Sequence, residues 1–234
     1  MKNMQLVILC GGLATRLGKL TKNVPKSMIR IDGRPFLEHQ IDNVKKHGIA
    51  DIVLCVSHLS ESIEKYFGDG KNFGVHIQYS YDGDKLLGPI GALKHAESYL
   101  DDVFFSMYGD SYVFVDFENI YAAFLKENKL GMMTAYQNFD KIDTSNLVIL
   151  DGKVVKYNNG KTKDMTFIDY GTSVFRKKAL DIVPKNVVFS TKDFYSKLIA
   201  ADELLAFKVK KRFYHIGDPL ALEDFQTYIK NQKN

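Results

Sequence analysis

The sequence predicts an α/β fold, with a mixed, mostly parallel sheet covered by helices on both faces. Short apolar runs alternate with amphipathic segments through the first half of the chain, which is typical of βαβ units. A length of 234 residues with 45% hydrophobic residues is enough for one sizeable buried core. Only five prolines occur, and they leave no obvious linker between two parts. We therefore expect residues 1–234 to form a single domain.

Strands and helices are expected to alternate through the first half of the chain. Strands are expected near 5–10, 51–57, 75–80 and 103–108. Helices are expected between them, near 35–47, 60–67 and 89–99. The first helix is the best marked, because apolar residues recur every three or four positions from Phe36 to Val44 and Gly48 follows a cationic last turn. Ligands of such a sheet gather at the carboxyl ends of its strands.

The second half is expected to make the sheet partly antiparallel. Asp151-Gly152 lies between the apolar runs 147–150 and 153–157, and this is the strongest short signal for a β-hairpin. A further strand is expected near 166–175. Three helices complete the fold, near 117–128, 191–201 and 219–230, the last opening with Pro219.

Composition and charge exclude several classes of protein. Cys10 and Cys55 lie in apolar runs, so they are expected to be reduced core thiols in a cytoplasmic protein. The net charge of +4 is too small to indicate nucleic-acid binding, and the cations of 208–212 alternate with apolar residues as on one face of a strand. No apolar run is long enough for a signal peptide or a membrane span. We expect neither a nucleic-acid nor a membrane partner.

A glycine-rich loop after the first strand carries the strongest functional signal. Gly11 and Gly12 follow shortly after Leu9, and their backbone N–H groups can approach an anion closely. The chain then supplies one hydroxyl and two cations suited to a polyphosphate: Thr15, Arg16 and Lys26. The loop is not a Walker A motif, which ends in Gly-Lys-Ser/Thr, and it lacks the third glycine of the dinucleotide fingerprint. For the glycines alone, a purely structural turn is the alternative.

Five landmarks in order make the chain resemble the sugar-phosphate nucleotidylyltransferases. The family signature is Gly-Gly-x-x-Thr-Arg-Leu followed by Pro-Lys, and residues 11–17 and 25–26 match it. The remaining landmarks are the loop 87–93, Gly109-Asp110, the run 168–171 and the run 213–219. The resemblance implies a Rossmann-like α/β/α sandwich, with a nucleotide-binding half over about 1–115 and a sugar-phosphate-binding half over about 116–234. It also implies that a sugar 1-phosphate oxygen attacks the α-phosphorus of a nucleoside triphosphate and releases pyrophosphate.

By this resemblance, Arg16, Lys26 and Asp110 are the catalytic residues. Arg16 would clamp the departing β and γ phosphates, and Lys26 would offset charge on the α-phosphate and the incoming sugar phosphate. Asp110 follows the apolar run 103–108 and would hold a Mg²⁺ that bridges the two substrates. No catalytic base is needed, because a sugar phosphate is already ionised at neutral pH.

The second metal ligand is open, because relatives carry an acidic residue where this chain has His215. Asp218 is the candidate replacement, and we assign it to the metal together with Asp110. The alternatives are a single protein carboxylate with waters, or a different metal. Asp218 equally suits the N-cap of the helix that begins at Pro219.

The resemblance assigns nucleotide binding to six positions: Leu9, Gly11, Gly12, Thr15, Asp82 and Gly88. Gly88 allows the chain to approach the base and ribose closely. An Asp82 carboxylate that accepts from the N1 and N2 donors of guanine would favour GTP, although Asp82-Gly83 is also a good turn. Pro89 and Ile90 depart from the usual loop sequence and leave the base preference open.

Four positions are assigned to the sugar phosphate: Asn146, Lys161, Asp169 and Gly171. Gly171 falls where relatives bring a strand backbone against the hexose, and Tyr170 beside it is expected to face the sugar. Lys161 suits the sugar phosphate, but Asn159-Gly160-Lys161 is also typical of a solvated turn.

The leading hypothesis is a Mg²⁺-dependent enzyme that joins GTP to a heptose or hexose 1-phosphate, most like the short guanylyltransferases of heptose 1-phosphate. One alternative is a UTP-, CTP- or dTTP-dependent member that acts on another sugar or on a non-sugar phosphate. Another is a catalytically silent regulatory protein that binds nucleotide sugars, which His215 would support. We also expect a possible homodimer, through a hairpin such as 147–157, and no additional acyltransferase domain within 234 residues.

Overall fold

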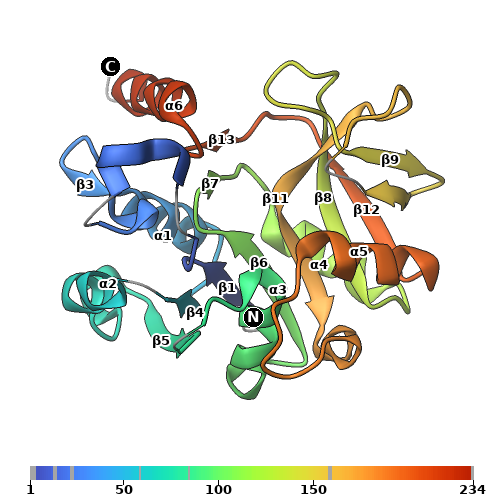
Figure 1. The fold of residues 1–234 in the computed structure, drawn as a ribbon, viewed down its shortest axis with the longest axis horizontal. Coiled ribbons are helices and arrows are strands. Elements are labelled where there is room, and N and C mark those ends of the chain that lie inside the picture. Colours follow the sequence, from blue (N-terminus) through green and yellow to red (C-terminus); the bar gives the residue numbers. More distant parts are fainter. Residues whose placement is uncertain are drawn as a thin grey trace.

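A nine-stranded mixed sheet forms the centre of the computed structural model, in the order β5-β4-β1-β6-β11-β8-β12-β10-β9 (Figure 1). The structure describes residues 4–12, 15–21, 24–57, 59–83, 85–157 and 160–232, without the side chains of Thr15, Lys19 and Leu20. Helices cover both faces of this sheet, so the predicted Rossmann-like α/β fold is confirmed.

The first half of the chain builds the parallel part of the sheet. Its strands are β1 (Gln5–Leu9), β4 (Asp51–Val56), β5 (His76–Tyr81) and β6 (Val103–Tyr108). Leu9 at the end of β1 pairs with Cys55 of β4 and with Tyr108 of β6. The carboxyl ends of these three strands therefore lie next to one another, where a parallel sheet binds its ligands.

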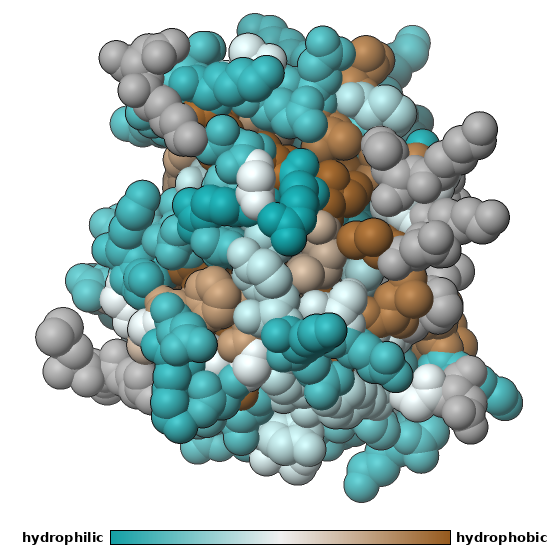
Figure 2. All heavy atoms as spheres, turned by 90° about the vertical axis from the view of Figure 1, so that its left-hand side faces the viewer, coloured by the Kyte–Doolittle hydropathy of each residue, from teal (hydrophilic) through white to brown (hydrophobic). Residues whose placement is uncertain are grey.

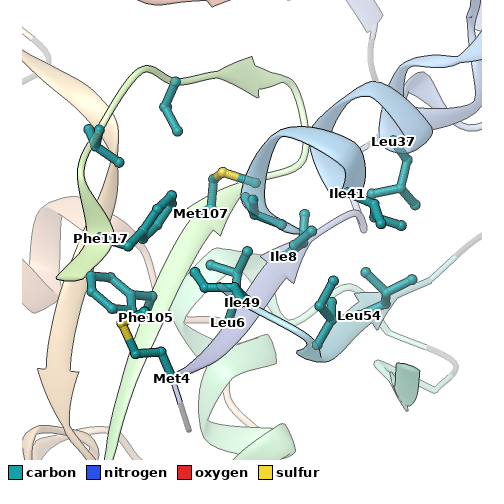
Figure 3. Packing of buried hydrophobic residues seen from close by; sticks show 14 of the residues in the cluster. Met4, Leu6, Ile8, Leu37, Ile41, Ile49, Leu54, Phe105, Met107 and Phe117 are labelled. Atoms are coloured by element: carbon teal, nitrogen blue, oxygen red, sulfur yellow. The ribbon is translucent and has the colours of Figure 1, made fainter. Parts of the chain in front are cut away.

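Two hydrophobic layers hold helices against the sheet. α1 (Phe36–Lys46), α2 (Ser60–Phe67) and α4 (Phe117–Leu125) pack on one face, and α3 (Gly88–His95) and α5 (Thr191–Ala200) pack on the other. In the first layer, Leu37 and Ile41 of α1 lie over Leu6, Ile8 and Leu54 of the parallel strands (Figure 3). Alternate residues of β1 enter opposite layers, since Ile8 belongs to the first and Val7 to the second.

The second half adds antiparallel strands around β11 (Phe167–Arg176). β11 runs antiparallel to β6 on one side and to β8 (Gly131–Gln137) on the other. β12 (Leu204–Val209) pairs parallel with β8, and β10 (Lys153–Tyr157) joins β12 to β9 (Leu147–Leu150). Asp151 and Gly152 between β9 and β10 both have positive φ, as a two-residue hairpin turn requires. The predicted hairpin is confirmed.

Short elements and the last helix complete the fold beside α1. Two small ribbons pair β2 (Arg30–Ile31) with β3 (Arg34–Pro35), and β7 (Ser111–Tyr112) with β13 (Tyr214–His215). The 3-10 turns are η1 (Thr15–Thr21), η2 (Lys26–Met28), η3 (Lys71–Phe73), η4 (Ala96–Tyr99) and η5 (Lys177–Ile182). α6 (Pro219–Asn231) packs Phe225 against Phe36 at a ring distance of 5.1 Å.

Most predicted elements occur, and the differences lie in the second half and at helix ends. The helix expected near 89–99 is α-helical only to His95 and then continues as η4. The strand β8 was not predicted, because Gly131, two methionines and an alanine give it little of the β-branched pattern that marks a strand.

The face that carries α1, α2 and α6 is mostly hydrophilic, with scattered hydrophobic residues (Figure 2). Within the described ranges, no helix has the length and apolar character to cross a membrane.

Candidate active site

A cavity of about 560 Å³ opens at the carboxyl ends of β1, β4 and β6. Most of the predicted nucleotide-binding and catalytic residues line it together: Leu9, Gly11, Gly12, Lys26, Asp82, Gly88 and Asp110. Its other walls come from the loop before α3, from α3 itself and from Tyr108 at the end of β6. The sequence had placed these residues on separate strands, and the parallel register brings them to one edge of the sheet.

The glycines of this edge allow the backbones of neighbouring segments to approach one another. A Cβ at Gly109 would lie 2.5 Å from the carbonyl oxygen of Leu9, which no side chain tolerates. A Cβ at Gly11 would lie 3.2 Å from Oγ of Ser57, and that hydroxyl donates to the Gly11 carbonyl at 2.9 Å. The loop therefore presents backbone rather than side chains to the cavity, as close binding of a phosphate group requires.

Lys26 and Asp110 form an ion pair inside the cavity, with 2.9 Å between Nζ and Oδ2. Lys26 begins the short turn η2 after Pro25, and Asp110 follows β6 by two residues. Ser111 donates from its hydroxyl to the other Asp110 oxygen at 3.3 Å. The side chains of Lys26 and Asp110 are 18% and 31% exposed, so both remain within reach of a ligand that enters the cavity.

Arg16 lies on η1 with an exposed side chain and is not among the described residues that line the cavity. The structure therefore does not bring it together with Lys26 and Asp110, and its phosphate-binding role stays a prediction. The side chain of Thr15, the neighbouring candidate, lies outside the described part of the chain.

Asp82 and Gly88 also line the cavity. Asp82 follows β5 directly, and burial raises the pKa of its half-buried carboxyl group, while the backbone N–H of Leu87 and the charge of His95 oppose this rise. Gly88 opens α3 with φ +72°, and a Cβ there would lie 3.1 Å from the carbonyl oxygen of Phe189. Only glycine fits both the backbone angle and the space at this position.

Asp169, Asn146 and Gly171 meet beside Tyr108, which links them to the cavity. The Tyr108 hydroxyl and the Gly171 N–H each donate to Asp169 at 2.9 Å, and the Asp169 N–H donates to Oδ1 of Asn146 at 3.0 Å. Burial raises the pKa of Asp169 to about 6, although hydrogen bonds from Gly171, Tyr108 and Tyr157 act to lower it. Three of the four predicted sugar-phosphate residues thus form one polar group.

The structure does not place Lys161 or the side chain of Tyr170 with the polar group around Asp169. Lys161 is exposed and forms an ion pair with Asp140 of a neighbouring loop, so the structure does not group it with Asp169. The expectation that Tyr170 faces the sugar is wrong. Tyr170 is fully buried in the layer below α4, where its hydroxyl accepts the N–H of Phe114 at 3.1 Å, because successive residues of β11 point to opposite faces.

Comparisons with known proteins agree with this geometry. A family model described as nucleotidyl transferase matches residues 5–145, which include the glycine loop, Lys26, Asp82 and Asp110. The chain belongs to the nucleotidyl transferase family.

Relatives within this family cover nearly the whole chain. The D-glycero-alpha-D-manno-heptose 1-phosphate guanylyltransferase of Campylobacter jejuni is 31% identical over 229 residues, which are 97% of this chain and 100% of that protein. The UTP–glucose-1-phosphate uridylyltransferase of Synechocystis is 32% identical over 84% of this chain, which spans only 55% of that relative. The structure of HddC from Yersinia pseudotuberculosis complexed with GMP-PN superimposes with a TM-score of 0.82 at 25% identity, over 97% of this chain and 99% of that one.

The donor set of this nucleotidyl transferase suits a metal held mainly by substrate. No cluster of three or more His, Cys, Asp or Glu side chains able to hold a metal occurs among the described residues. Asp110 offers a carboxylate at the cavity, and Mg²⁺ commonly binds through one or two carboxylates together with substrate phosphates. The Asp110 side chain therefore fits a Mg²⁺ that arrives with a nucleotide.

The second candidate ligand has a structural task. Oδ1 of Asp218 accepts the N–H groups of Leu220 and Ala221, both at 3.1 Å. Asp218 therefore caps α6, which is the structural role predicted for it beside metal binding. Nδ1 of His215 accepts the N–H of Gly217 at 3.1 Å, so the imidazole proton lies on Nε2 when the ring is neutral. Metal binding by Asp218 stays a prediction.

Sequence reasoning missed two residues of the candidate site, Tyr108 and Ser111. Tyr108 lines the cavity and holds Asp169, and Ser111 contacts the Asp110 carboxylate. The available signal was their position on either side of Gly109-Asp110, where side chains must lie near the predicted carboxylate. The hydrogen bond of Tyr108 depends on β11, which comes 61 residues later in the chain, whereas Ser111 bonds its sequence neighbour Asp110.

Proposed function

We propose that the protein transfers a guanylyl group from GTP to a sugar 1-phosphate, with heptose or hexose as the sugar, and releases pyrophosphate. The observation that carries the proposal is the Lys26–Asp110 pair, placed in one cavity with a glycine loop and a second carboxylate. Support comes from relatives named for nucleotidyl transfer to heptose and glucose 1-phosphates.

The reaction needs positioning and charge neutralisation more than a nucleophile from the protein. A phosphate oxygen of the sugar phosphate forms a bond to the α-phosphorus, and the bond from that phosphorus to the bridging oxygen of pyrophosphate breaks. Lys26 lies where an ammonium group can offset charge on the α-phosphate and the incoming phosphate. Arg16 is proposed to hold the β and γ phosphates from η1.

Asp110 is the residue that would hold Mg²⁺, which supplies positive charge to the phosphates of both substrates. This carboxylate is paired with Lys26 at 2.9 Å. Asp110 would hold the cation through its carboxylate, and the Lys26 ammonium would then be available to phosphate. The ion pair thus keeps both groups in place before substrate binds, at little cost because both side chains are partly exposed.

GTP is preferred because of Asp82, whose two carboxylate oxygens suit the adjacent N1 and N2 donors of guanine. The carboxylate lines the cavity together with Gly88, and Oδ2 lies 3.5 Å from where a Cβ of Gly11 in the glycine loop would stand. A solved relative was crystallised with GMP-PN, and another relative is named a guanylyltransferase. UTP, CTP and dTTP remain alternatives, as the uridylyltransferase among the relatives illustrates.

A pyrophosphate-release assay tests the proposal, with GTP, UTP, CTP and dTTP each combined with a panel of sugar 1-phosphates that includes heptose and hexose compounds. We expect turnover with GTP to exceed that with the other three nucleotides. The Asp82→Asn variant is expected to lower kcat/KM for GTP by roughly 10- to 100-fold, because about 1–3 kcal/mol of discrimination rests on a paired carboxylate contact.

Residual turnover with UTP supplies the control, since Asp82→Asn should leave it nearly unchanged. Equal losses with GTP and UTP would assign Asp82 to the structure of the loop rather than to the base. No turnover with any pair, together with tight binding of a nucleotide sugar, would favour the catalytically silent regulatory protein.

A further inference from the structure

Asp169 is a buried carboxylate that no cation neutralises among the described residues. It is 9% exposed, and hydroxyl and backbone N–H groups rather than charges surround it. Its two oxygens have separate partners: Oδ1 accepts the Gly171 N–H, and Oδ2 accepts the Tyr108 hydroxyl, each at 2.9 Å. An uncompensated carboxylate is costly to bury, so a residue of this kind is expected to serve a specific task.

Both partners of Asp169 lie against the segment that carries Asp110. Tyr108 precedes Asp110 by two residues at the end of β6. Gly171 packs on Ser111 so closely that a Cβ at this position would lie 2.8 Å from Oγ and 2.9 Å from Cβ of Ser111. Ser111 in turn donates to Oδ1 of Asp110 at 3.3 Å. Asp169 therefore reaches the Asp110 segment from both sides without touching Asp110.

We propose that Asp169 is a positioning residue for Asp110, acting through the Tyr108 side chain and through the Gly171 backbone. The proposal rests on the proposed function, because it takes Asp110 as the metal-binding carboxylate. It is independent of a sugar contact, since each Asp169 oxygen keeps a lone pair that a sugar hydroxyl can use. Residues that orient a metal ligand typically affect metal affinity or activity by about 10- to 100-fold.

The chemistry of the two contacts explains why a carboxylate serves here. The Gly171 N–H and the Tyr108 hydroxyl approach different oxygens, and the Tyr157 hydroxyl also contacts the carboxylate. An asparagine has one acceptor oxygen and one NH₂ group, so it keeps only one of the Gly171 and Tyr108 contacts in its present form. A leucine keeps neither. The order of effects expected from positioning is therefore leucine, then asparagine, then the wild-type residue.

The test compares Asp169→Leu, Asp169→Asn and Tyr108→Phe with the control Ser173→Ala. Ser173 lies on the same strand, is also buried and bonds Tyr195 at 3.3 Å, a tyrosine that itself faces Asp169, so the Ser173 side chain is one contact further from Asp110 than Asp169 is. Mn²⁺ is the probe, and its binding is measured by water-proton relaxation, with Asp110→Ala as the background. We expect Asp169→Leu to weaken Mn²⁺ binding about tenfold or more and Asp169→Asn less.

Steady-state kinetics give the second readout, with circular dichroism to verify folding. Positioning predicts a lower kcat in the Asp169 variants, with KM for GTP changed less than about threefold, and a smaller loss in Tyr108→Phe, which keeps the Gly171 contact. Ser173→Ala should lose clearly less than Asp169→Asn in both readouts, because its side chain reaches Asp169 only through Tyr195. If Asp169→Leu does not fold, the comparison of Asp169→Asn with Ser173→Ala decides.

Three outcomes would overturn the proposal. One is unchanged Mn²⁺ binding in Asp169→Asn with a raised KM for the sugar phosphate, which makes Asp169 a sugar contact only. Another is equal losses in Asp169→Asn and Ser173→Ala. The third is wild-type Mn²⁺ binding no stronger than that of Asp110→Ala, which removes the ligand to be positioned. If no sugar phosphate turns over while Mn²⁺ binding still follows the predicted order, the proposed substrates fail and the positioning role stands.

Discussion

On the proposed nucleotide side of the site, Gly11, Asp82 and Asp110 each come within two residues of the end of a parallel strand. On the proposed sugar side, Asp169 and Gly171 lie inside the long antiparallel strand β11. The nucleotide side has a lysine paired with a partly exposed carboxylate. The sugar side has a buried carboxylate among tyrosines. A charged ligand can replace the Lys26–Asp110 contact, because both side chains are partly exposed. The hydrogen bonds of the buried Asp169 instead hold the neighbouring segments in place.

The largest effect is expected where charge develops during the reaction, on the nucleotide side. Lys26→Ala should lower kcat by about 10²–10³-fold, the usual cost of removing one electrostatic donor from a transition state. Stability should change little, because the Lys26–Asp110 pair is partly exposed. Arg16→Ala is expected to lower the rate by orders of magnitude too if its predicted contact with the departing phosphates forms. Pyrophosphate-release kinetics and thermal melts measure both quantities.

Lys46→Ala is the matched control for charge, because Lys46 is an exposed lysine in the last turn of α1. It should leave kcat unchanged. A loss in Lys26→Ala that is no larger than that in Lys46→Ala would mean that the nucleotide side is not the reacting centre.

How far the sequence predicts the site follows the same division. Gly11 and Asp110 could be assigned because each closely follows a predicted parallel strand, and Lys26 could be assigned because it belongs to the Pro-Lys pair of the family signature. The support on the sugar side could not, since Tyr108 meets Asp169 only through the pairing of β6 with β11. Arg16 shows the limit of local patterns, because the signature identifies it while its exposed side chain is not among the described residues that line the cavity.

An intermediate loss of stability and of kcat is expected from Gly171→Ala, a substitution on the sugar side. Gly171 has φ +91°, and an added Cβ would meet Ser111 at 2.8 Å. We expect a loss of about 1–3 kcal/mol in stability from backbone strain and crowding. Displacement of Ser111 should also lower kcat, since its hydroxyl contacts Asp110. Thermal melting and steady-state kinetics measure the two losses.

Gly152→Ala separates crowding from backbone strain. Gly152 has φ +75° in the β9–β10 turn, and a Cβ there would have no other atom within 4 Å. This variant should lose some stability through its φ angle and keep full activity. Full activity in Gly171→Ala as well would show that the sugar-side support does not reach Asp110.

The smallest effect is expected in the pH dependence of stability, through the buried carboxylate of Asp169. Burial raises its pKa to about 6, whereas the unfolded value is near 3.8. At pH 5 the folded protein keeps a proton that the unfolded chain has lost, so protonation stabilises the fold, and this stabilisation is lost as the pH rises through 6. Between pH 5 and 7 the loss is about 1 kcal/mol, or a fall of roughly 2–4 °C in Tm for a protein of this size.

Comparison with Asp169→Asn isolates this contribution, because asparagine does not titrate and fills the same space. The difference in Tm between the wild type and Asp169→Asn should change by roughly 2–4 °C between pH 5 and 7. The Tm of the wild type should fall relative to that of Asp169→Asn as the pH rises. Tyr108, Tyr157 and Tyr195 face Asp169 from β6, β10 and α5, and burial raises the pKa of each, so they stay neutral in this window. A difference independent of pH would mean that Asp169 is already ionised at pH 5, because the three hydroxyls and the Gly171 N–H then compensate its charge as fully as water would.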